Sequence, residues 1–206
     1  FSWTGFYIGG HLGGAWSDLD QIRTGGIQHY YTLNKTIGTE NNGLWGGAHL
    51  GAQWQSGQFV FGAEVSWSDG ELEDTLRTSG PFALNTYDTD ISDMFTAAVR
   101  VGYAFDRWLA YVKGGYATAD ISTRSTEIPS FNHTGTSSER HDGWTIGGGI
   151  EYALTNSIVV GVEYSYVDLN SKIHPLADNA PQGGIERVNV DPQGLSSVVG
   201  RFSLKF

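Results

Sequence analysis

Bulky apolar residues alternate with small or polar residues along several stretches of the chain. In the stretch 194–206, Phe202 and Leu204 share one face of an extended strand, while Arg201 and Ser203 share the other. The same period of two residues recurs in the stretches 59–68, 93–105, 143–154 and 158–168. Because successive side chains of a β-strand point to opposite faces, this alternation predicts strands with one apolar and one polar face.

Three short polar breaks separate neighbouring strands and lie about 50 residues apart, at 56–58, 106–107 and 155–157. Each break lies between two alternating runs, which predicts a tight hairpin turn. Longer stretches rich in Thr, Ser, Asn, Asp and Gly are predicted to be loops, at 17–43, 69–92, 121–142 and 169–193. The order of strand, long loop, strand and short turn occurs four times. It predicts eight antiparallel strands, at about 4–16, 44–55, 59–68, 93–105, 108–120, 143–154, 158–168 and 194–206.

The two strand faces differ in a way that indicates which one lines the interior. Eight strands closed into a barrel enclose room only for modest side chains, so the face of small residues and isolated charges is expected to point inward. The bulky apolar face then points outward, where only lipid accepts it. Aromatic residues are predicted to form two girdles, where amphipathic rings prefer the membrane interface. The girdles comprise Trp16, Trp67, Phe95, Tyr116, Trp144 and Tyr166 at one edge, and Trp54, Phe59, Tyr103, Phe105, Trp108, Tyr152, Phe202 and Phe206 at the other.

The composition agrees with a membrane barrel and excludes one class of partner. Charged residues make up 17% of the chain and aromatic residues 13%, whereas an ordinary soluble domain is about 25% charged. The net charge of −10 argues against nucleic acid as a partner, since a phosphate-binding surface is basic. Residues 1–206 are expected to form a single domain, the mature chain of an exported protein whose signal peptide has been removed.

Motifs at both ends and in the middle of the chain resemble a known family. Residues 3–10 and 199–206, together with 101–105 and 161–164, are similar to the small outer-membrane β-barrel proteins of alphaproteobacteria. That family includes surface antigens, opacity-type proteins and haemin-binding proteins, is often described as a porin family, and is similar to the OmpA membrane domain. The resemblance implies a multi-pass, up-and-down barrel in the bacterial outer membrane, with four long extracellular loops and three short periplasmic turns. It also implies that the outer-membrane assembly machinery reads the chain end at Phe206.

Charged residues on the inward face are expected to form a network that plugs the lumen. Since a charge in a narrow lumen is costly unless it is paired, near-balance of the two signs is expected. The predicted network comprises Glu64, Arg100, Lys113, Glu151, Glu163 and Arg201. His11 and His49 also point inward; a metal site there is an alternative, but two histidines without a settled third ligand favour hydrogen-bonded packing and no metal. No serine is clearly placed to complete a catalytic set with His49 and Glu64, so no catalytic residues are assigned.

The polar stretches contain the candidate ligand residues. His29, Tyr30 and Tyr31 could ligate haem iron, as the resemblance to haemin-binding proteins suggests. The second stretch is acidic, which favours either a solvated surface or a cation bridge to lipopolysaccharide.

The leading hypothesis is a surface-exposed, non-enzymatic structural protein that supports envelope integrity and needs no cofactor. A receptor for haemin or another ligand and a narrow porin are the alternatives. Outer-membrane lipid and lipopolysaccharide are the expected partners, and self-association is left open.

Overall fold

The computed structural model describes residues 1–25, 36–70, 72–79, 84–128, 133–178 and 185–206. The described chain is built of β-strands joined by turns. The strands are β1 (Gly5–Gly25), β2 (Thr36–Ser56), β3 (Phe59–Gly70), β4 (Leu72–Ser79), β5 (Leu84–Phe105), β6 (Trp108–Ile128), β7 (His133–Ala153), β8 (Ile158–Leu169), β9 (Lys172–Asp178) and β10 (Ile185–Lys205). Within these residues, no helix has the length and apolar character needed to cross a membrane.

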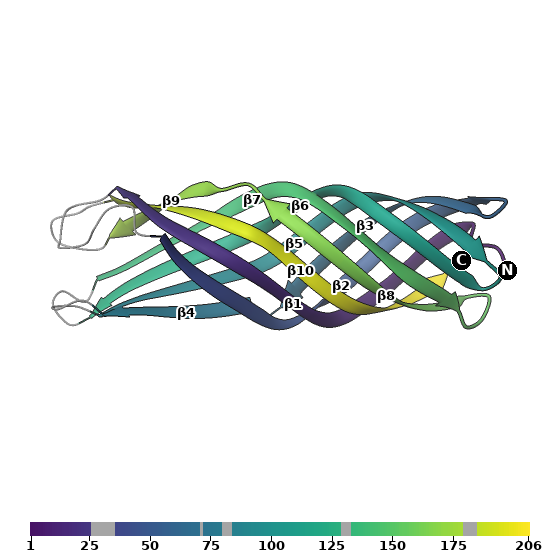
Figure 1. The fold of residues 1–206 in the computed structure, drawn as a ribbon, viewed down its shortest axis with the longest axis horizontal. Coiled ribbons are helices and arrows are strands. Elements are labelled where there is room, and N and C mark those ends of the chain that lie inside the picture. The colour runs from purple at the N-terminus through teal and green to yellow at the C-terminus, as the bar shows by residue number, and fades with distance from the viewer. Residues whose placement is uncertain (26–35, 71, 80–83, 129–132, 179–184) are drawn as a thin grey trace.

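In the described residues, eight strands close into a barrel in which every neighbouring pair is antiparallel. The order around the ring is β1-β2-β3-β5-β6-β7-β8-β10, and the pairing of β1 with β10 closes it. The two remaining strands, β4 and β9, pair with β5 and β10 at the end of the barrel away from both chain termini (Figure 1). The predicted eight-stranded up-and-down barrel is confirmed.

Short turns join the strands at the end where both termini lie (Figure 1). Gly57 adopts a φ of 62° between β2 and β3, and Asp106 adopts a φ of 54° between β5 and β6. Both values lie in the left-handed region that tight hairpins require, which glycine adopts freely and Asp tolerates better than most residues. The turns therefore form at the polar breaks found in the sequence.

The long polar stretches are mostly strand, so the prediction that they are loops is wrong for much of their length. Asp20 is paired with Gly38 and Thr123 with Ser137, well beyond the ends predicted for these strands. Thr is itself a good strand former, so the polar composition of these stretches does not exclude a strand. Strands of 21 residues, such as β6, are roughly twice as long as the ten or so that cross a membrane. The sheet therefore continues as a tube beyond the membrane-spanning wall.

Neighbouring residues on the strands confirm which face is inside. Val99 is 66% exposed and the next residue, Arg100, is 2% exposed. On β8, Val162 is 59% exposed and Glu163 is 4% exposed. Bulky apolar side chains thus cover the outer wall, which is stable only if the wall contacts lipid.

Aromatic side chains on the outer wall lie next to one another across the strands. Trp67 is paired with Phe95, and the rings of Trp144 and Tyr166 are 5.7 Å apart, towards the long-strand end. Towards the turn end, the rings of Trp108 and Tyr152 are 4.7 Å apart. These contacts form two girdles with an apolar band between them, as membrane barrels require.

Candidate functional site

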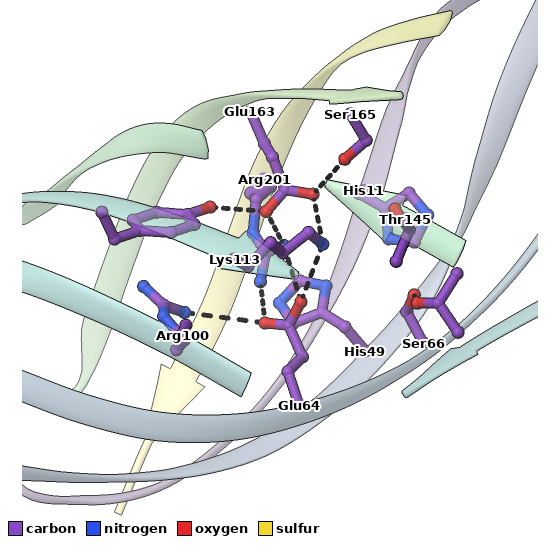
Figure 2. A network of polar contacts seen from close by, with 12 residues as sticks. His11, His49, Glu64, Ser66, Arg100, Lys113, Thr145, Glu163, Ser165 and Arg201 are labelled. Carbon is purple, nitrogen blue, oxygen red and sulfur yellow. Dashed lines mark hydrogen bonds and ion pairs between the residues drawn. The ribbon is translucent and has the colours of Figure 1, made fainter. Parts of the chain in front are cut away.

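The six charged residues predicted to share the lumen lie together inside the barrel, and Figure 2 labels all of them except Glu151. Each comes from a different strand, and each side chain is buried. They are Glu64 from β3, Arg100 from β5, Lys113 from β6, Glu151 from β7, Glu163 from β8 and Arg201 from β10. Strands far apart in the sequence therefore contribute to one ionic layer.

Glu64 and Glu163 face each other across the lumen and share two cations (Figure 2). Lys113 Nζ lies 3.2 Å from Glu64 Oε1 and 2.7 Å from Glu163 Oε1. Arg201 Nη1 donates to the same two carboxylates, at 3.1 Å to Glu64 and 2.6 Å to Glu163. Removal of any one of these four groups leaves a buried charge without a full set of partners.

Arg100 extends the layer towards β7 and is also packed against aromatic rings. Its Nη2 donates to Glu151 Oε2 at 2.8 Å, and its guanidinium carbon lies 3.8 Å from the centre of the Tyr111 ring. Its Nη1 donates to Tyr7 Oη at 3.1 Å. Ring-stacked arginine keeps its donors in a fixed plane, so Arg100 is held in one orientation.

Two tyrosines reach the layer across glycines, a feature that the sequence analysis missed. Tyr7 on β1 lies opposite Gly51 on β2, which lies opposite Glu64 on β3. Because Gly51 has no side chain, the Tyr7 ring passes over it, and Tyr7 Oη donates to Glu64 Oε2 at 2.9 Å.

The same arrangement recurs on the opposite wall. Tyr111 on β6 passes over Gly149 on β7 and donates to Glu163 Oε2 on β8 at 2.6 Å. Tyr111 has the same parity in its strand as Lys113, and this parity is the sequence signal that could have placed it inside. The glycine between donor and acceptor is evident only from the pairing of three strands.

The signs of the six charges balance, with three carboxylates opposite three cations. Desolvation of each ion costs several kcal/mol, which mutual attraction and hydrogen bonds offset only when the geometry is good. Here each carboxylate has at least one cation within 3.6 Å. The layer is therefore stable as a set and sensitive to loss of one member.

Apolar side chains pack inside the barrel on both sides of the ionic layer, in two clusters that we call the apolar seals. Towards the turns, the side chain of Trp3 folds into the barrel mouth with 0% exposure and packs in a cluster with Val60, Ala104, Leu109, Tyr111, Ala153 and Val159. Towards the long-strand end, the cluster comprises Ala15, Trp45, Ile91, Met94, Ala117, Ala119, Ile121, Val167, Leu169, Leu195 and Val199. The alternation in the sequence predicted small and charged residues inside, and these two apolar seals were not predicted.

A cavity of about 30 Å³ lies between the ionic layer and the second apolar seal. Its lining includes the hydroxyl side chains of Ser66, Ser68 and Thr96, as well as Lys113 and Glu163. This volume holds roughly two water molecules. It is too small for an organic substrate.

The two lumen histidines are hydrogen-bonded to hydroxyl groups. His49 Nε2 lies 2.8 Å from Ser203 Oγ, and His11 Nε2 lies 2.9 Å from Ser68 Oγ. His49 reaches β10 because Gly9 stands between them, where a Cβ atom would come within 2.6 Å of His49 Nε2. Sequence reasoning found no serine beside His49, because the closure of β1 against β10 is what brings Ser203 close.

The pairing of His49 and Ser203 lacks the rest of a catalytic set. Within the described residues, His49 Nδ1 has no hydrogen-bond partner to orient the ring. A nucleophile and base normally need a third group in that position. Ser203 is also buried, with 4% exposure. No described geometry therefore supports catalysis.

The predicted ligand residues His29, Tyr30 and Tyr31 lie outside the described residues. Among the residues that are described, no group of three or more His, Asp or Glu side chains is placed to hold a metal ion by itself.

A second histidine pair lies in the tube beyond the membrane-spanning wall. His141 on β7 and His174 on β9 are both fully buried, and their Nε2 atoms lie 2.8 Å apart. Burial and the nearby His141 lower the pKa of His174 to about 4. Burial also lowers the pKa of His141, an effect that the Asn170 carbonyl opposes. Both rings are therefore neutral at neutral pH.

Comparison with known proteins adds to this picture. Residues 2–196 match the family described as "Outer membrane protein beta-barrel domain". The chain is 30% identical over 191 residues to the 31 kDa outer-membrane immunogenic protein of Brucella melitensis, and the alignment covers 87% of this chain and 77% of the relative. It is also 30% identical over 189 residues to the 22 kDa outer membrane protein of Rhizobium leguminosarum bv. viciae, with 92% and 75% covered.

Solved structures show the same fold at low sequence identity. The outer membrane protein OprG from Pseudomonas aeruginosa superposes with a TM-score of 0.58 at 14% identity, covering 98% of this chain and 96% of OprG. The outer membrane protease OmpT from Escherichia coli superposes with a TM-score of 0.57 at 10% identity, covering 98% and 97%. At such identities the likeness concerns the barrel fold and not the activity.

Proposed function

The chain belongs to the outer-membrane β-barrel family, and from this premise we propose that it is a sealed structural barrel that supports the cell envelope. It is an outer-membrane protein, and its wall spans the bilayer between the two aromatic girdles. The single observation that carries the proposal is the three-layered lumen, in which a charge-balanced layer is enclosed by two apolar clusters.

The same three layers argue against the alternative function, a narrow porin. A hydrated ion crossing the barrel would have to pass Trp3 and Leu109, displace the paired charges, and then pass Trp45 and Ile121. Each of these apolar side chains is at most 2% exposed. Since an eight-stranded barrel leaves little interior space, the side chains have no room to move aside without unfolding the wall.

Lipid and lipopolysaccharide are the proposed partners of the outer wall and of the strands above it. Exposed charged pairs lie just beyond the girdle at the long-strand end, which is the extracellular end if the short turns are periplasmic, as in barrels of this kind. Arg140 is paired with Asp120 at 2.7 Å, and Lys172 with Asp142 at 2.9 Å. The basic member of each pair is also a suitable partner for a phosphate group of the lipopolysaccharide leaflet.

Phe206 is the residue through which we propose that the assembly machinery recognises the chain. Its side chain is 74% exposed, more than any other large apolar residue in the described wall. Its backbone nitrogen donates to Phe6 O at 2.9 Å, so the residue is aligned with the seam between β1 and β10. Phe206→Ala is expected to slow insertion into the membrane with little effect on the stability of the inserted barrel.

Planar-bilayer recording tests the sealed barrel directly. Purified protein inserted into a bilayer is expected to show no steady conductance. The positive control is a triple variant, Trp3→Ala with Arg201→Ala and Trp45→Ala, prepared in the same way. It truncates one residue of the ionic layer and one of each apolar seal, and it shows whether the recording detects an opened barrel. A stable open state of the unmodified protein would contradict the proposal.

A further inference from the structure

From the arrangement of His141 and His174, we propose that the tube beyond the membrane holds one divalent transition-metal ion between their Nε2 atoms. The cation is of the class that imidazole favours, with Zn²⁺ as its representative. The pair belongs neither to the lumen layer nor to the wall, and the inference does not depend on the sealed barrel.

The first observation is the convergence of two buried rings. The two Nε2 atoms lie 2.8 Å apart, and the ring centres are 5.1 Å apart with an interplanar angle of 34°. Both side chains are 0% exposed although they lie in the water-facing part of the tube. His141 lies three residues from Trp144 of the aromatic girdle, on the side away from the apolar band. This part of the strand is therefore outside the lipid tails and accessible to aqueous cations.

The second observation is the proton on His141. Its Nδ1 lies 2.8 Å from the carbonyl oxygen of Asn170, which can only accept a hydrogen bond, so Nδ1 carries the proton. In the neutral ring, Nε2 then presents a lone pair towards His174. In metal sites, the ring nitrogen that does not bind the metal usually donates a hydrogen bond, often to a backbone carbonyl, and this bond orients the histidine.

The third observation is that neither tautomer of His174 satisfies its surroundings. If His174 carries its proton on Nε2, it donates to His141, and its buried Nδ1 is left as an acceptor with no hydrogen-bond partner among the described residues. The nearby backbone group is the Ser137 carbonyl, which is itself an acceptor. If the proton is on Nδ1 instead, two Nε2 lone pairs face each other at 2.8 Å and repel.

A cation between the rings removes this conflict. Both histidines would then carry the proton on Nδ1, directed at the carbonyls of Asn170 and Ser137, and both lone pairs would bind the ion. Zn–N bonds of about 2.0–2.1 Å in tetrahedral geometry place the two nitrogens about 3.3 Å apart. The rings need to separate by only about half an ångström. Among the described residues, β9 pairs with β7 at two register positions, Gly135 and Thr136, and with β10 at six.

The charges around the pair favour a cation. Glu139 lies two residues before His141 on the same face of β7, and its charge acts on both imidazoles. The positive charge of Lys172 is offset by its ion pair with Asp142. Water would have to complete the coordination shell of the ion, since the described side chains supply two imidazole ligands.

Calorimetric titration of the full chain with Zn²⁺ tests the site. The protein is used without a histidine tag, folded in detergent micelles, with Mg²⁺ as the hard cation that imidazole does not favour. We expect one Zn²⁺ per chain and no heat from Mg²⁺. Affinity should fall by roughly tenfold or more in His141→Gln and in His174→Gln, because each loses one ligand.

The variants are chosen so that folding does not decide the result. A glutamine amide keeps a hydrogen bond between β7 and β9, and strand content by circular dichroism checks that the barrel is intact. His133→Gln, on the same strand, is the matched control and should bind as the unmodified chain does. Zn²⁺ should also raise the unfolding temperature of the unmodified chain but not of His141→Gln. Absence of Zn²⁺ binding at about 1 mM would overturn the proposal. So would an affinity in both Gln variants equal to that of the unmodified chain.

Discussion

Tyr7 donates a hydrogen bond to Glu64 from two strands away, at 2.9 Å, across a glycine of the strand between them. The contact shows how the barrel builds a polar interior in little space. Glycine removes the side chain on one strand so that a long side chain from its neighbour can lie flat against the wall. Tyr111 and Glu163 repeat this relationship on the other side.

The glycine under the Tyr7 ring is therefore expected to be sensitive to a single methyl group. In Gly51→Ala the new Cβ would come within 2.8 Å of Ala63 O and would collide with the Tyr7 ring. We expect a loss of about 1–3 kcal/mol in the free energy of unfolding, as for overpacked cores. Urea unfolding in lipid vesicles measures it. Gly10→Ala is the control, since a Cβ there meets nothing closer than 3.5 Å; equal losses in both would show that the glycine slot is unimportant.

Removal of Glu64 should be among the most damaging single changes in the lumen. Glu64→Ala leaves Arg201 and Lys113 without one of their two shared carboxylates. Loss of one partner from a buried ion pair costs about 3–5 kcal/mol. The same unfolding assay should show a smaller combined loss for Glu64→Ala with Lys113→Ala than the sum of the two single losses. Additive losses would mean that the charges are not coupled.

The surface pair of Asp120 and Arg140 should behave differently from the lumen pairs. The hydrogen bond from Arg140 lowers the pKa of Asp120 below its ordinary value of 3.8. Because the folded state favours the carboxylate, its small contribution is present above pH 3.8 and is lost as the pH falls through the lowered value. Amide hydrogen exchange in β6 and β7 should differ slightly between Asp120→Asn and the unmodified chain at neutral pH. The difference should vanish in acid or at about 1 M salt; persistence under both conditions would contradict an ionic origin.

Ser203 should be inert towards serine-directed reagents. It lies 2.8 Å from His49, but the ring has no described orienting partner, and Ser203 itself is only 4% exposed. A fluorophosphonate probe is expected to leave the folded protein unlabelled, as judged by mass spectrometry. Labelling that is lost in Ser203→Ala and His49→Gln would instead reveal an active nucleophile.

Loss of one seal should not open the barrel. Trp3→Ala removes a fully buried ring from the turn-end cluster and should destabilise the protein by about 3–5 kcal/mol. The ionic layer and the cluster around Trp45 remain, so bilayer recordings should still show no steady conductance. Channel activity from this single change would mean that the layers above Trp3 do not seal.

The alternation of residues along the chain was enough to determine the barrel, its inside and outside faces, the three tight turns and the membership of the charged layer. These features depend on local geometry, because a strand places every second side chain on the same face and each turn follows from a few residues. Glu163 and Val162 could be assigned to opposite faces from parity alone.

Which residues are neighbours across the barrel was decided only by the tertiary structure. Register and closure bring Ser203 to His49, lay Tyr111 over Gly149, and join His141 to His174, although 33 residues separate that last pair in the chain. Polar composition also concealed the outer parts of the strands, because Thr and Ser occur in loops as well as in strands. Such relationships depend on the pairing of several strands at once, and no single stretch of sequence contains that information.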